Sequence, residues 1–507
     1  MTDKAPTPGS AGDASDSGIK GTGACGAMAL NGRSRGIGAR HRYRQIETVI
    51  MLSLLLSGCA ADLGQVAPDP PALPAGYQAS SRPSMAPPRD LRDWWQAFQD
   101  PVLTELIGRA AGQNLSIEQA RLRLAAGRAH ADAAHTLFLP STGISGHALA
   151  GSRRIKFDDP FRKPLQAGLD MSWDVGLFGL QENTSRSAAA SAAILTEDAE
   201  AIRVVVAAEI ACAYIRLRAA QQRYALLPAL LALRKRGTRL ADTRLTSGLA
   251  SPAESDEARV AFAEAEADLE RLSAQIGQLQ QQIATLVGTS MIDPILLKPA
   301  PQPTARGIPA IGRPADLLRA RPDIRSDEQH VLRAAAEVGI AQSDLYPKLR
   351  LIGSIGVGAP SSSPFAVMGG PSLQIPLFDY GRRQAALKAR QLQFEEALVA
   401  YRQTVLVAYE EASSAWRTWT ADHAATARLR TSMTASANID RQAQVLRREG
   451  LSDQAKADTA AALALIRRKQ MVDAQELEAL ALVAVYKSIG GASPLSATNS
   501  DRGLDRK

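Results

Sequence analysis

Apolar residues recur with two different periods along this chain. Over residues 182–244, and again over residues 382–448, they recur every three to four positions, which predicts two helices of about 60–70 residues. Helices of that length extend roughly 90–100 Å, far beyond the usual helix of a globular protein. Each long pattern is followed, after a glycine, by a shorter helical pattern, over 251–287 and 452–487. The chain therefore carries two very long helical hairpins.

Two prolines affect the predicted helices, one inside a helix and one at a helix start. Pro228 lies inside the first long pattern, where it removes a backbone hydrogen bond, so we expect a bend or a break there. Earlier in the chain, Asp100 followed by Pro101 is a favourable helix start. It predicts one helix that extends to about His135.

A strict alternation of apolar and polar positions marks the segments between these helices. Residues 165–177 place apolar side chains on one side and Asp170 and Asp174 on the other, and residues 365–377 alternate in a similar way. Strands of a buried parallel sheet would not carry these aspartates, whereas a strand between lipid and water would. An ordinary antiparallel sheet is the alternative. The two hairpins, 141–177 and 349–377, give only four strands, so they form a small sheet or several chains contribute to one barrel.

The same order of elements occurs twice. Each half consists of a helix, a strand pair, a very long helix, a glycine turn and a further long helix. Three pairs of landmarks share a separation near 200 residues: Pro140 and Pro347 (207), Phe178 and Phe378 (200), and Gly248 and Gly450 (202). A common spacing indicates duplication rather than chance similarity. We assign the first repeat to residues 93–290, a linker to 291–314, the second repeat to 315–490 and a C-terminal tail to 491–507.

The N-terminal region indicates the compartment. An uncharged apolar run, Thr48 to Gly58, is too short to span a bilayer but suits a signal peptide, and an arginine-rich stretch precedes it. It ends in Leu-Ser-Gly-Cys at Cys59, which resembles the bacterial lipobox. That resemblance implies a signal peptide within residues 1–58 and a covalent N-acyl and S-diacylglycerol lipid on Cys59. Residues 59–92 then form a Pro-rich tether.

Two further features concern this leader. Ala60 follows the cysteine, and the absence of aspartate there implies sorting to the outer membrane. A polar stretch of some 45 residues precedes the apolar run, and translation from Met28 instead of Met1 would give a signal peptide of ordinary length.

Composition and charge exclude several classes of function. The net charge of +8 includes +3 within residues 1–58, and the rest is spread without a Lys/Arg block, which argues against a nucleic-acid partner. Three scattered cysteines give neither a disulfide framework nor a zinc site. The sequence contains no Walker A, H-E-x-x-H or C-x-x-C motif. We therefore expect no enzyme, no catalytic or metal site, and no cofactor besides the lipid.

Four segments together resemble TolC-like outer-membrane factors of the NodT efflux-lipoprotein type. They are DWWQAFQDPVLTELIGRAAGQNLSIEQARLRLAAGRA (93–129), SWDVGLFG (172–179), ADLLRARPDIRSDEQHVLRAAAEVGIAQSDLYPKLRL (315–351) and PLFDYGRR (376–383). The resemblance covers roughly residues 52–490. It implies a mainly α fold with a membrane β-barrel: a homotrimer in which each chain gives four strands to a 12-stranded barrel and long helices to a periplasmic tunnel. The linker would lie near the equator of that tunnel.

The same resemblance implies two kinds of site. In the family an acidic ring constricts the periplasmic mouth, and here Asp458 stands at the matching aspartate. Ala455 occupies the companion acidic position, and Asp453 is the residue that would substitute for it. The alternative is that Asp453 and Asp458 are ordinary acids near a helix start, where they suit the helix dipole. The turns between the long helices, Ser247, Gly248 and Leu249 in one and Gly450 and Leu451 in the other, would be tips that dock a periplasmic adaptor.

These observations predict the outer-membrane channel of a tripartite efflux system, in the outer membrane of a Gram-negative bacterium and extending into the periplasm. The channel would be a passive exit duct for drugs or other small molecules, served by a periplasmic adaptor and an inner-membrane pump of the RND type. One alternative is a channel for ABC-driven polypeptide (type I) secretion, although the lipobox favours efflux. Another is a periplasmic coiled-coil adaptor or structural lipoprotein, against which the strand hairpins argue.

Overall fold

The computed structural model describes residues 68–74, 76–77, 91–148, 165–305, 313–359 and 365–491. The chain divides into two units, Met1–Ala60 and Ala61–Lys507, and every described residue belongs to the second. Cys59, which we predict to carry the lipid, lies outside the described residues.

The described elements follow the order predicted for a duplicated chain. The first repeat contains η1 (Leu91–Phe98), α2 (Pro101–Gln113), α3 (Leu115–Thr136), β1 (Ser141–Ala148), β2 (Leu165–Val175), α4 (Leu180–Thr246) and α5 (Pro252–Val287). The short helix α6 (Pro294–Leu297) lies in the linker. The second repeat contains η2 (Pro314–Asp316), α7 (Leu317–Ala320), α8 (Pro322–Ser343), β3 (Lys348–Ala359), β4 (Phe365–Gln374), α9 (Arg382–Arg448) and α10 (Gln454–Ser488). Both long helices have 67 residues, which confirms the predicted helical hairpins.

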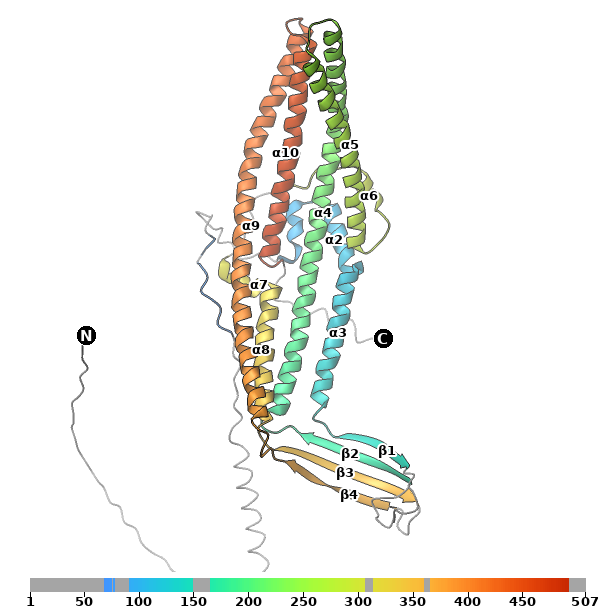
Figure 1. Cartoon of the computed structure of the whole chain (residues 1–507), viewed down its shortest axis with the longest axis vertical. Coiled ribbons are helices and arrows are strands. Elements are labelled where there is room, and N and C mark those ends of the chain that lie inside the picture. The colour runs from blue at the N-terminus through green and yellow to red at the C-terminus, as the bar shows by residue number, and fades with distance from the viewer. Residues whose placement is uncertain are drawn as a thin grey trace, which may run out of the picture. The chain divides into compact units, whose positions relative to one another are not determined.

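Strands and helix tips lie at opposite ends of this unit (Figure 1). The four strands form one antiparallel sheet in the order β1-β2-β3-β4. Next to the sheet the helices follow the same order, because α3 packs on α4, α4 on α8, and α8 on α9. The sheet therefore has β1 and β4 as its edges, and the helical layer has α3 and α9 as its outer members. Among the described residues, no helix is long and apolar enough to cross a membrane.

The duplication has two offsets rather than one. Elements before the strand hairpin correspond at 207 residues, as the 22-residue helices α3 and α8 show. Elements after it correspond at 202 residues, as the glycines Gly179 and Gly381 show, which precede α4 and α9 with φ of 79° and 83°. The second hairpin is thus five residues shorter. The pairing of Phe178 with Phe378 was wrong, because Tyr380 is the residue that shares the positive φ of Phe178.

The structure departs from one expectation about helix continuity and excludes one of the two outcomes expected at Pro228. The predicted helix from Asp100 to about His135 is interrupted at Asn114, whose side chain accepts hydrogen bonds from the N–H groups of Ser116 and Ile117 and so starts α3. The Asn114 amide also donates to the Leu286 carbonyl of α5, 2.6 Å away. This contact with a distant segment fixes the break.

At Pro228, by contrast, α4 does not break. Pro228 and Tyr224, whose carbonyl loses its usual partner, lie on the exposed side of the helix, where water can hydrate that carbonyl. Leu227 beside them is buried, so packing on the other side holds the helix in place.

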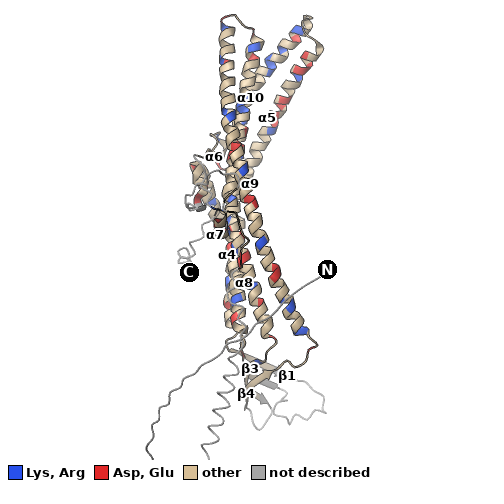
Figure 2. Cartoon of the chain, turned by 90° about the vertical axis from the view of Figure 1, so that its left-hand side faces the viewer, with Lys and Arg blue, Asp and Glu red and all other residues tan. Residues whose placement is uncertain are grey.

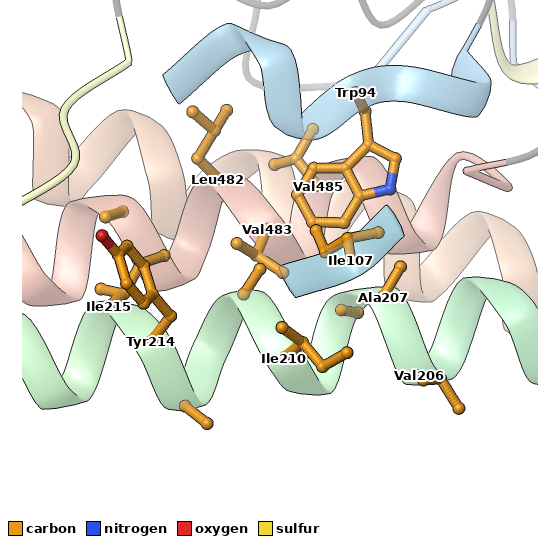
Figure 3. Close-up of a cluster of buried hydrophobic side chains, with 14 of the residues drawn as sticks. Trp94, Ile107, Val206, Ala207, Ile210, Tyr214, Ile215, Leu482, Val483 and Val485 are labelled. Carbon is orange, nitrogen blue, oxygen red and sulfur yellow. The ribbon is translucent and has the colours of Figure 1, made fainter. Parts of the chain in front are cut away.

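A buried apolar core lies where η1, α2, α4 and α10 meet (Figure 3). Trp94 and Ile107 pack there against Ile210 of α4 and Val483 of α10. Each fully buried side chain of this size contributes roughly 1.5–3 kcal/mol. The first residues of the first repeat and the last helix of the second are thereby joined at mid-height, which leaves the helix tips and the sheet as projecting ends.

Candidate functional site: the two helical tips

Both predicted docking turns have the same backbone geometry. At the first tip, the Leu249 N–H donates to the Arg244 carbonyl (2.7 Å) across Gly248, whose φ is 71°. At the second, the Leu451 N–H donates to the Leu446 carbonyl (2.8 Å) across Gly450, whose φ is 72°. This is the left-handed glycine cap that ends a helix and satisfies its last carbonyls.

Each tip presents a leucine to solvent. The exposed fraction is 70% for Leu249 and 75% for Leu451. Ser247 ends α4, and its hydroxyl donates to the Thr243 carbonyl at 2.8 Å. An apolar side chain on a rigid, capped turn is suited to insertion into a partner's surface.

The helices that leave the two tips are capped alike. The Ser251 hydroxyl accepts a hydrogen bond from the Glu254 N–H at the start of α5, and the Asp453 carboxylate accepts one from the Lys456 N–H at the start of α10. Asp453 is half-exposed and also pairs with the Lys456 ammonium at 3.7 Å. Its place in the structure is therefore that of a helix cap, which is the alternative considered for it above.

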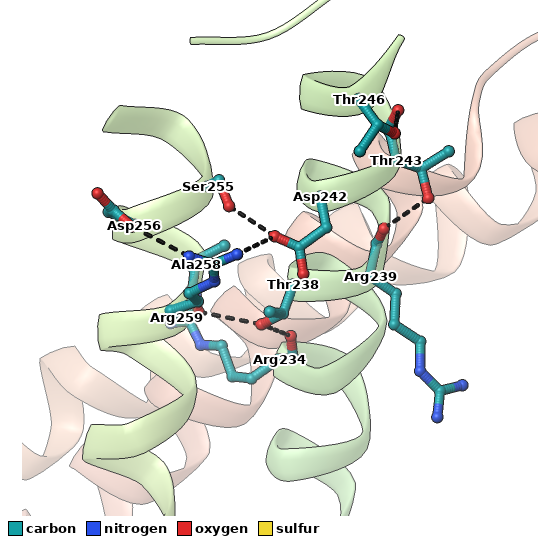
Figure 4. Close-up of polar contacts among 10 residues, drawn as sticks. All are labelled: Arg234, Thr238, Arg239, Asp242, Thr243, Thr246, Ser255, Asp256, Ala258 and Arg259. Atoms are coloured by element: carbon teal, nitrogen blue, oxygen red, sulfur yellow. Dashed lines mark hydrogen bonds and ion pairs between the residues drawn. The ribbon is translucent and has the colours of Figure 1, made fainter. Parts of the chain in front are cut away.

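A polar network ties α4 to α5 just below the first tip (Figure 4). The Asp242 carboxylate accepts hydrogen bonds from the Ser255 hydroxyl (2.6 Å) and from the Arg259 guanidinium (2.9 Å). The hydrogen bond from Ser255, supported by Arg259, holds the pKa of Asp242 below its usual range. Thr238 adds a hydrogen bond to the Ala258 carbonyl of α5. The first tip is thus a braced hairpin.

Asp458 has a different environment from Asp453. Its carboxylate forms a bidentate ion pair with Arg236 of α4, at 3.0 and 2.9 Å, and accepts a third hydrogen bond from the Gln454 amide at 2.7 Å. The Arg236 hydrogen bond holds the pKa of Asp458 below its usual range. In this conformation the Asp458 charge is therefore balanced within its own chain. The structure does not join Asp453 to Asp458.

A groove of about 880 Å³ lies between α4, α9 and α10 below the tips, and Arg236 and Asp458 are part of its wall. Other basic side chains on the wall are Arg441, Arg447 and Arg468, against the single further acid Asp440. Figure 2 shows that the two hairpins separate toward their tips and that acidic residues recur along α5. The space between the hairpins therefore has a predominantly basic lining.

Sequence reasoning missed Arg236 as a site residue. It lies 222 residues before Asp458, and no local pattern connects an arginine in one helix with an aspartate so far away. The basic run Arg234-Lys235-Arg236 was the one available signal. Among the described residues, no group of three or more His, Cys, Asp or Glu side chains could hold a metal ion.

Comparison with known proteins connects these features to a family. Residues 106–289 and 314–491 match the family described as "Outer membrane efflux protein". Nodulation protein T of Rhizobium leguminosarum bv. trifolii is 28% identical over 384 residues, which cover 73% of this chain and 80% of that protein. Outer membrane protein OprJ of Pseudomonas aeruginosa is 25% identical over 416 residues, which cover 79% of this chain and 86% of that protein.

A solved structure agrees with these matches. The structure of the outer-membrane channel OprN has a TM-score of 0.72 and 28% identity to this chain, and it covers 85% of this chain and 100% of OprN. The family resemblance and the fold class predicted from the sequence are confirmed, and the similar proteins are channels rather than enzymes.

Proposed function

Because the chain belongs to the outer membrane efflux protein family, we propose that it is the outer-membrane component of a tripartite efflux system. It is a passive exit duct for drugs or other small molecules, which an inner-membrane pump of the RND type hands over through a periplasmic adaptor. The chain supplies the path, and the pump supplies the energy.

The observation that carries this proposal is the pair of matching tips at the end of the long helices, opposite the strands. Leu249 and Leu451 occupy equivalent, exposed places on turns with the same glycine cap. Two equivalent tips per chain suit a partner that presents the same docking surface repeatedly around a ring. We therefore assign the adaptor contact to Ser247, Gly248 and Leu249 at one tip and to Gly450 and Leu451 at the other.

The proposed working form is a homotrimer. The described residues of one chain provide a single helical layer next to a sheet with two free edges, and they enclose no duct by themselves. Exposed apolar residues on the outer helices, such as Leu122 of α3 and Val399 of α9, indicate surfaces that a further copy covers. Three copies arranged head to tail around an axis would close the layer into a tunnel.

The gate and the anchor are further parts of the proposal. Asp458 and Asp453 would form the acidic constriction of the mouth, and Asp458 would be free to do so only after release from Arg236. The lipid on Cys59 would hold the chain at the outer membrane. Cys59→Ala should abolish incorporation of radiolabelled palmitate into the protein, whereas Cys212→Ala should leave it unchanged.

In-cell photo-crosslinking from the tips tests the functional proposal. A photoreactive amino acid is placed at Ala253 and at Leu451, both exposed, and the trapped partner is identified by mass spectrometry. We choose Leu451 rather than Asp453 because substitution of Asp453 would remove the cap of α10. Val260, exposed on α5 two turns from Ala253, is the matched control site.

The identity of the trapped protein decides between the functions. We expect the adaptor of a proton-driven pump at both tips and far less of it at Val260. Capture of an ABC-linked adaptor would instead support polypeptide or peptide export. Equal capture at all three sites, or none at the tips of an assembled protein, would overturn the docking assignment.

A further inference from the structure

A cavity of about 220 Å³ lies beside the apolar core at mid-height, where η1, α2, α3 and α4 meet. Buried apolar side chains form much of its wall: Ile107 and Ala110 of α2, Ile117 of α3 and Ile210 of α4. An apolar cavity of about 150 Å³ is large enough to hold benzene. This cavity can therefore hold a molecule with one substituted ring, and its wall shares no residue with the tips or with the groove below them.

Two neighbouring tryptophans of η1 line the cavity. Nε1 of Trp94 and Nε1 of Trp95 are both buried, and neither donates a hydrogen bond to any acceptor among the described residues. Trp94 is 4% exposed, its ring stacks on Tyr486 of α10 with centroids 5.5 Å apart, and Trp95 packs edge-on against it at 5.8 Å. Packing thus fixes the Trp94 ring and leaves its N–H without a protein acceptor in this part of the chain.

The Trp94 N–H faces the cavity. A β-carbon built on Gly491, which is itself a wall residue, would lie 3.6 Å from Trp94 Nε1 and 2.9 Å from the Val204 side chain of α4. In Figure 3 the nitrogen lies on the edge of the Trp94 ring toward Ala207, another wall residue. The donor is therefore at the cavity wall, within reach of a molecule inside.

The unpartnered donor indicates what kind of molecule fits. Buried polar groups of native proteins are nearly always hydrogen-bonded, because a buried N–H without an acceptor destabilises the folded state. A charged ligand is disfavoured among these apolar side chains, since the wall offers only the half-exposed pair Glu200–Arg203, whose charges balance each other. We propose that the cavity binds a small neutral molecule with an apolar body and a carbonyl oxygen, which accepts a hydrogen bond from Trp94 Nε1.

This site would hold a small molecule rather than pass it on. The ligand would touch η1 at the start of the first repeat and Gly491 after the last helix of the second, so its binding should stabilise the folded chain. Neither the adaptor nor the pump takes part in this binding. The site can therefore fail its test while the efflux function stands, and the reverse also holds.

Two fluorinated ligands of matched size test the hydrogen bond in the purified full-length protein. Para-fluoroacetophenone has a carbonyl oxygen, and para-ethylfluorobenzene has the same carbon skeleton without it. Their Kd values follow from the broadening of the fluorine NMR signal as protein is added. Trp94→Phe keeps an aromatic ring but removes the N–H, so it should raise the Kd of the ketone roughly fivefold and that of the hydrocarbon less than about twofold. Partition into detergent is the same for every variant, so it cancels in these ratios.

Two further variants serve as controls. Trp416→Phe also removes a buried indole N–H that has no acceptor among the described residues, but Trp416 lies on α9 outside the cavity wall. It should leave the Kd of both ligands unchanged. Ala111→Leu enlarges an exposed wall residue of α2, so it should fill the cavity and abolish binding of both ligands. Because Ala111 is at the surface, this variant tests the site even if Trp94→Phe does not fold.

Four results would contradict the proposal. Equal weakening of both ligands by Trp94→Phe would exclude the hydrogen bond, and unchanged binding by Ala111→Leu would exclude the site. Absence of binding to the wild-type protein would exclude the ligand class. Binding that is seen only after deletion of residues 492–507 would show that the chain's own C-terminal residues occupy the cavity instead.

Discussion

Arg236 of α4 and Asp458 of α10 form a bidentate ion pair that joins the two helical hairpins of one chain near their tips. Both guanidinium–carboxylate distances are 3.0 Å or less, and Gln454 adds a third hydrogen bond to the carboxylate. Arg236 is half-exposed, so water screens the pair and its contribution is modest, roughly 0.5–1 kcal/mol. It nevertheless joins α4 of one hairpin directly to α10 of the other, so we expect even this small energy to affect the spacing of the tips.

Loss of this ion pair should let the hairpins move apart. Spin labels at Leu240 and Leu463, both partly exposed on α4 and α10, would report the distance between the hairpins by pulsed electron paramagnetic resonance. Asp458→Asn keeps the size of the side chain but removes its charge, so we expect a broader and longer distance distribution. The charge exchange Arg236→Asp with Asp458→Arg should restore the original one.

Asp453→Asn is the matched control for that experiment. Asparagine caps a helix as well as aspartate does, so the start of α10 should be preserved and the distance unchanged. If the charge exchange behaved like the single variant Asp458→Asn, the ion pair would not be what holds the hairpins together.

The ion pair should survive mild acid. Arg236 lowers the pKa of Asp458 in the folded protein. The stabilisation that the ion pair contributes is therefore fully present above the unfolded pKa of about 3.9, and it is lost as the pH falls through the lower folded pKa. The spin-label distance should therefore stay constant from pH 7.5 to 5 and lengthen only below about pH 4. In Asp458→Asn the long distance should be present at every pH. A transition near pH 6 would assign the acid response to another group.

The tip glycines should resist substitution for a purely conformational reason. A β-carbon on Gly248 or Gly450 would meet no atom within 4 Å, so the cost of alanine comes from the positive φ alone, roughly 1 kcal/mol. We expect each variant to raise the hydrogen-exchange rate of the leucine N–H that follows the glycine, Leu249 or Leu451, about fivefold. Gly277→Ala, also in open space but inside α5, should instead stabilise its helix by about 1 kcal/mol. Equal effects of all three variants would contradict the special role of the caps.

Sequence patterns could predict the parts of this fold that depend on local signals. The 3.6-residue periodicity predicted α9 over residues 382–448, and the glycine before Leu451 predicted its end. Asn114 could not be recognised as a break, because its second hydrogen bond goes to Leu286 in another helix. The shared Leu-Phe pair favoured Phe378 as the counterpart of Phe178, whereas the glycine that follows each residue and the positive φ of both identify Tyr380.

The candidate site likewise has a part that local signals predict and a part that depends on contacts between distant helices. The tips are local turns with glycine signals, so their positions followed from the sequence alone. The pairing of Asp458 with Arg236 depends on how two distant helices pack, and α4 carries several arginines of similar appearance. The charges of a site between packed helices are therefore the part that sequence patterns constrain least.

An ion pair introduced between neighbouring copies should strengthen their contact. Within the chain, Arg325 and Glu197 pair at 2.6 Å, and both side chains are about one-fifth exposed. By the offsets of 207 and 202 residues between the repeats, the counterparts of Arg325 and Glu197 are Glu118 of α3 and Val399 of α9, which face each other between copies in the proposed head-to-tail ring. Glu118→Arg with Val399→Glu should therefore reproduce that pair and raise the temperature at which the oligomer dissociates on a denaturing gel. Val399→Glu alone would place an acid against Glu118 of the next copy, and it should lower that temperature.

The double-mutant cycle separates pairing from the loss of apolar surface. We expect a favourable coupling of roughly 0.5–1 kcal/mol per contact between the guanidinium introduced by Glu118→Arg and the carboxylate introduced by Val399→Glu. The matched control combines Glu118→Arg with Leu392→Glu, because Leu392 is also exposed on α9, seven residues from Val399, and should show no coupling. Because both acids remove apolar surface from α9, a coupling confined to Val399 can arise only if residue 118 of the next copy lies beside it. Strictly additive effects at both positions would place α9 and α3 of neighbouring copies in another register.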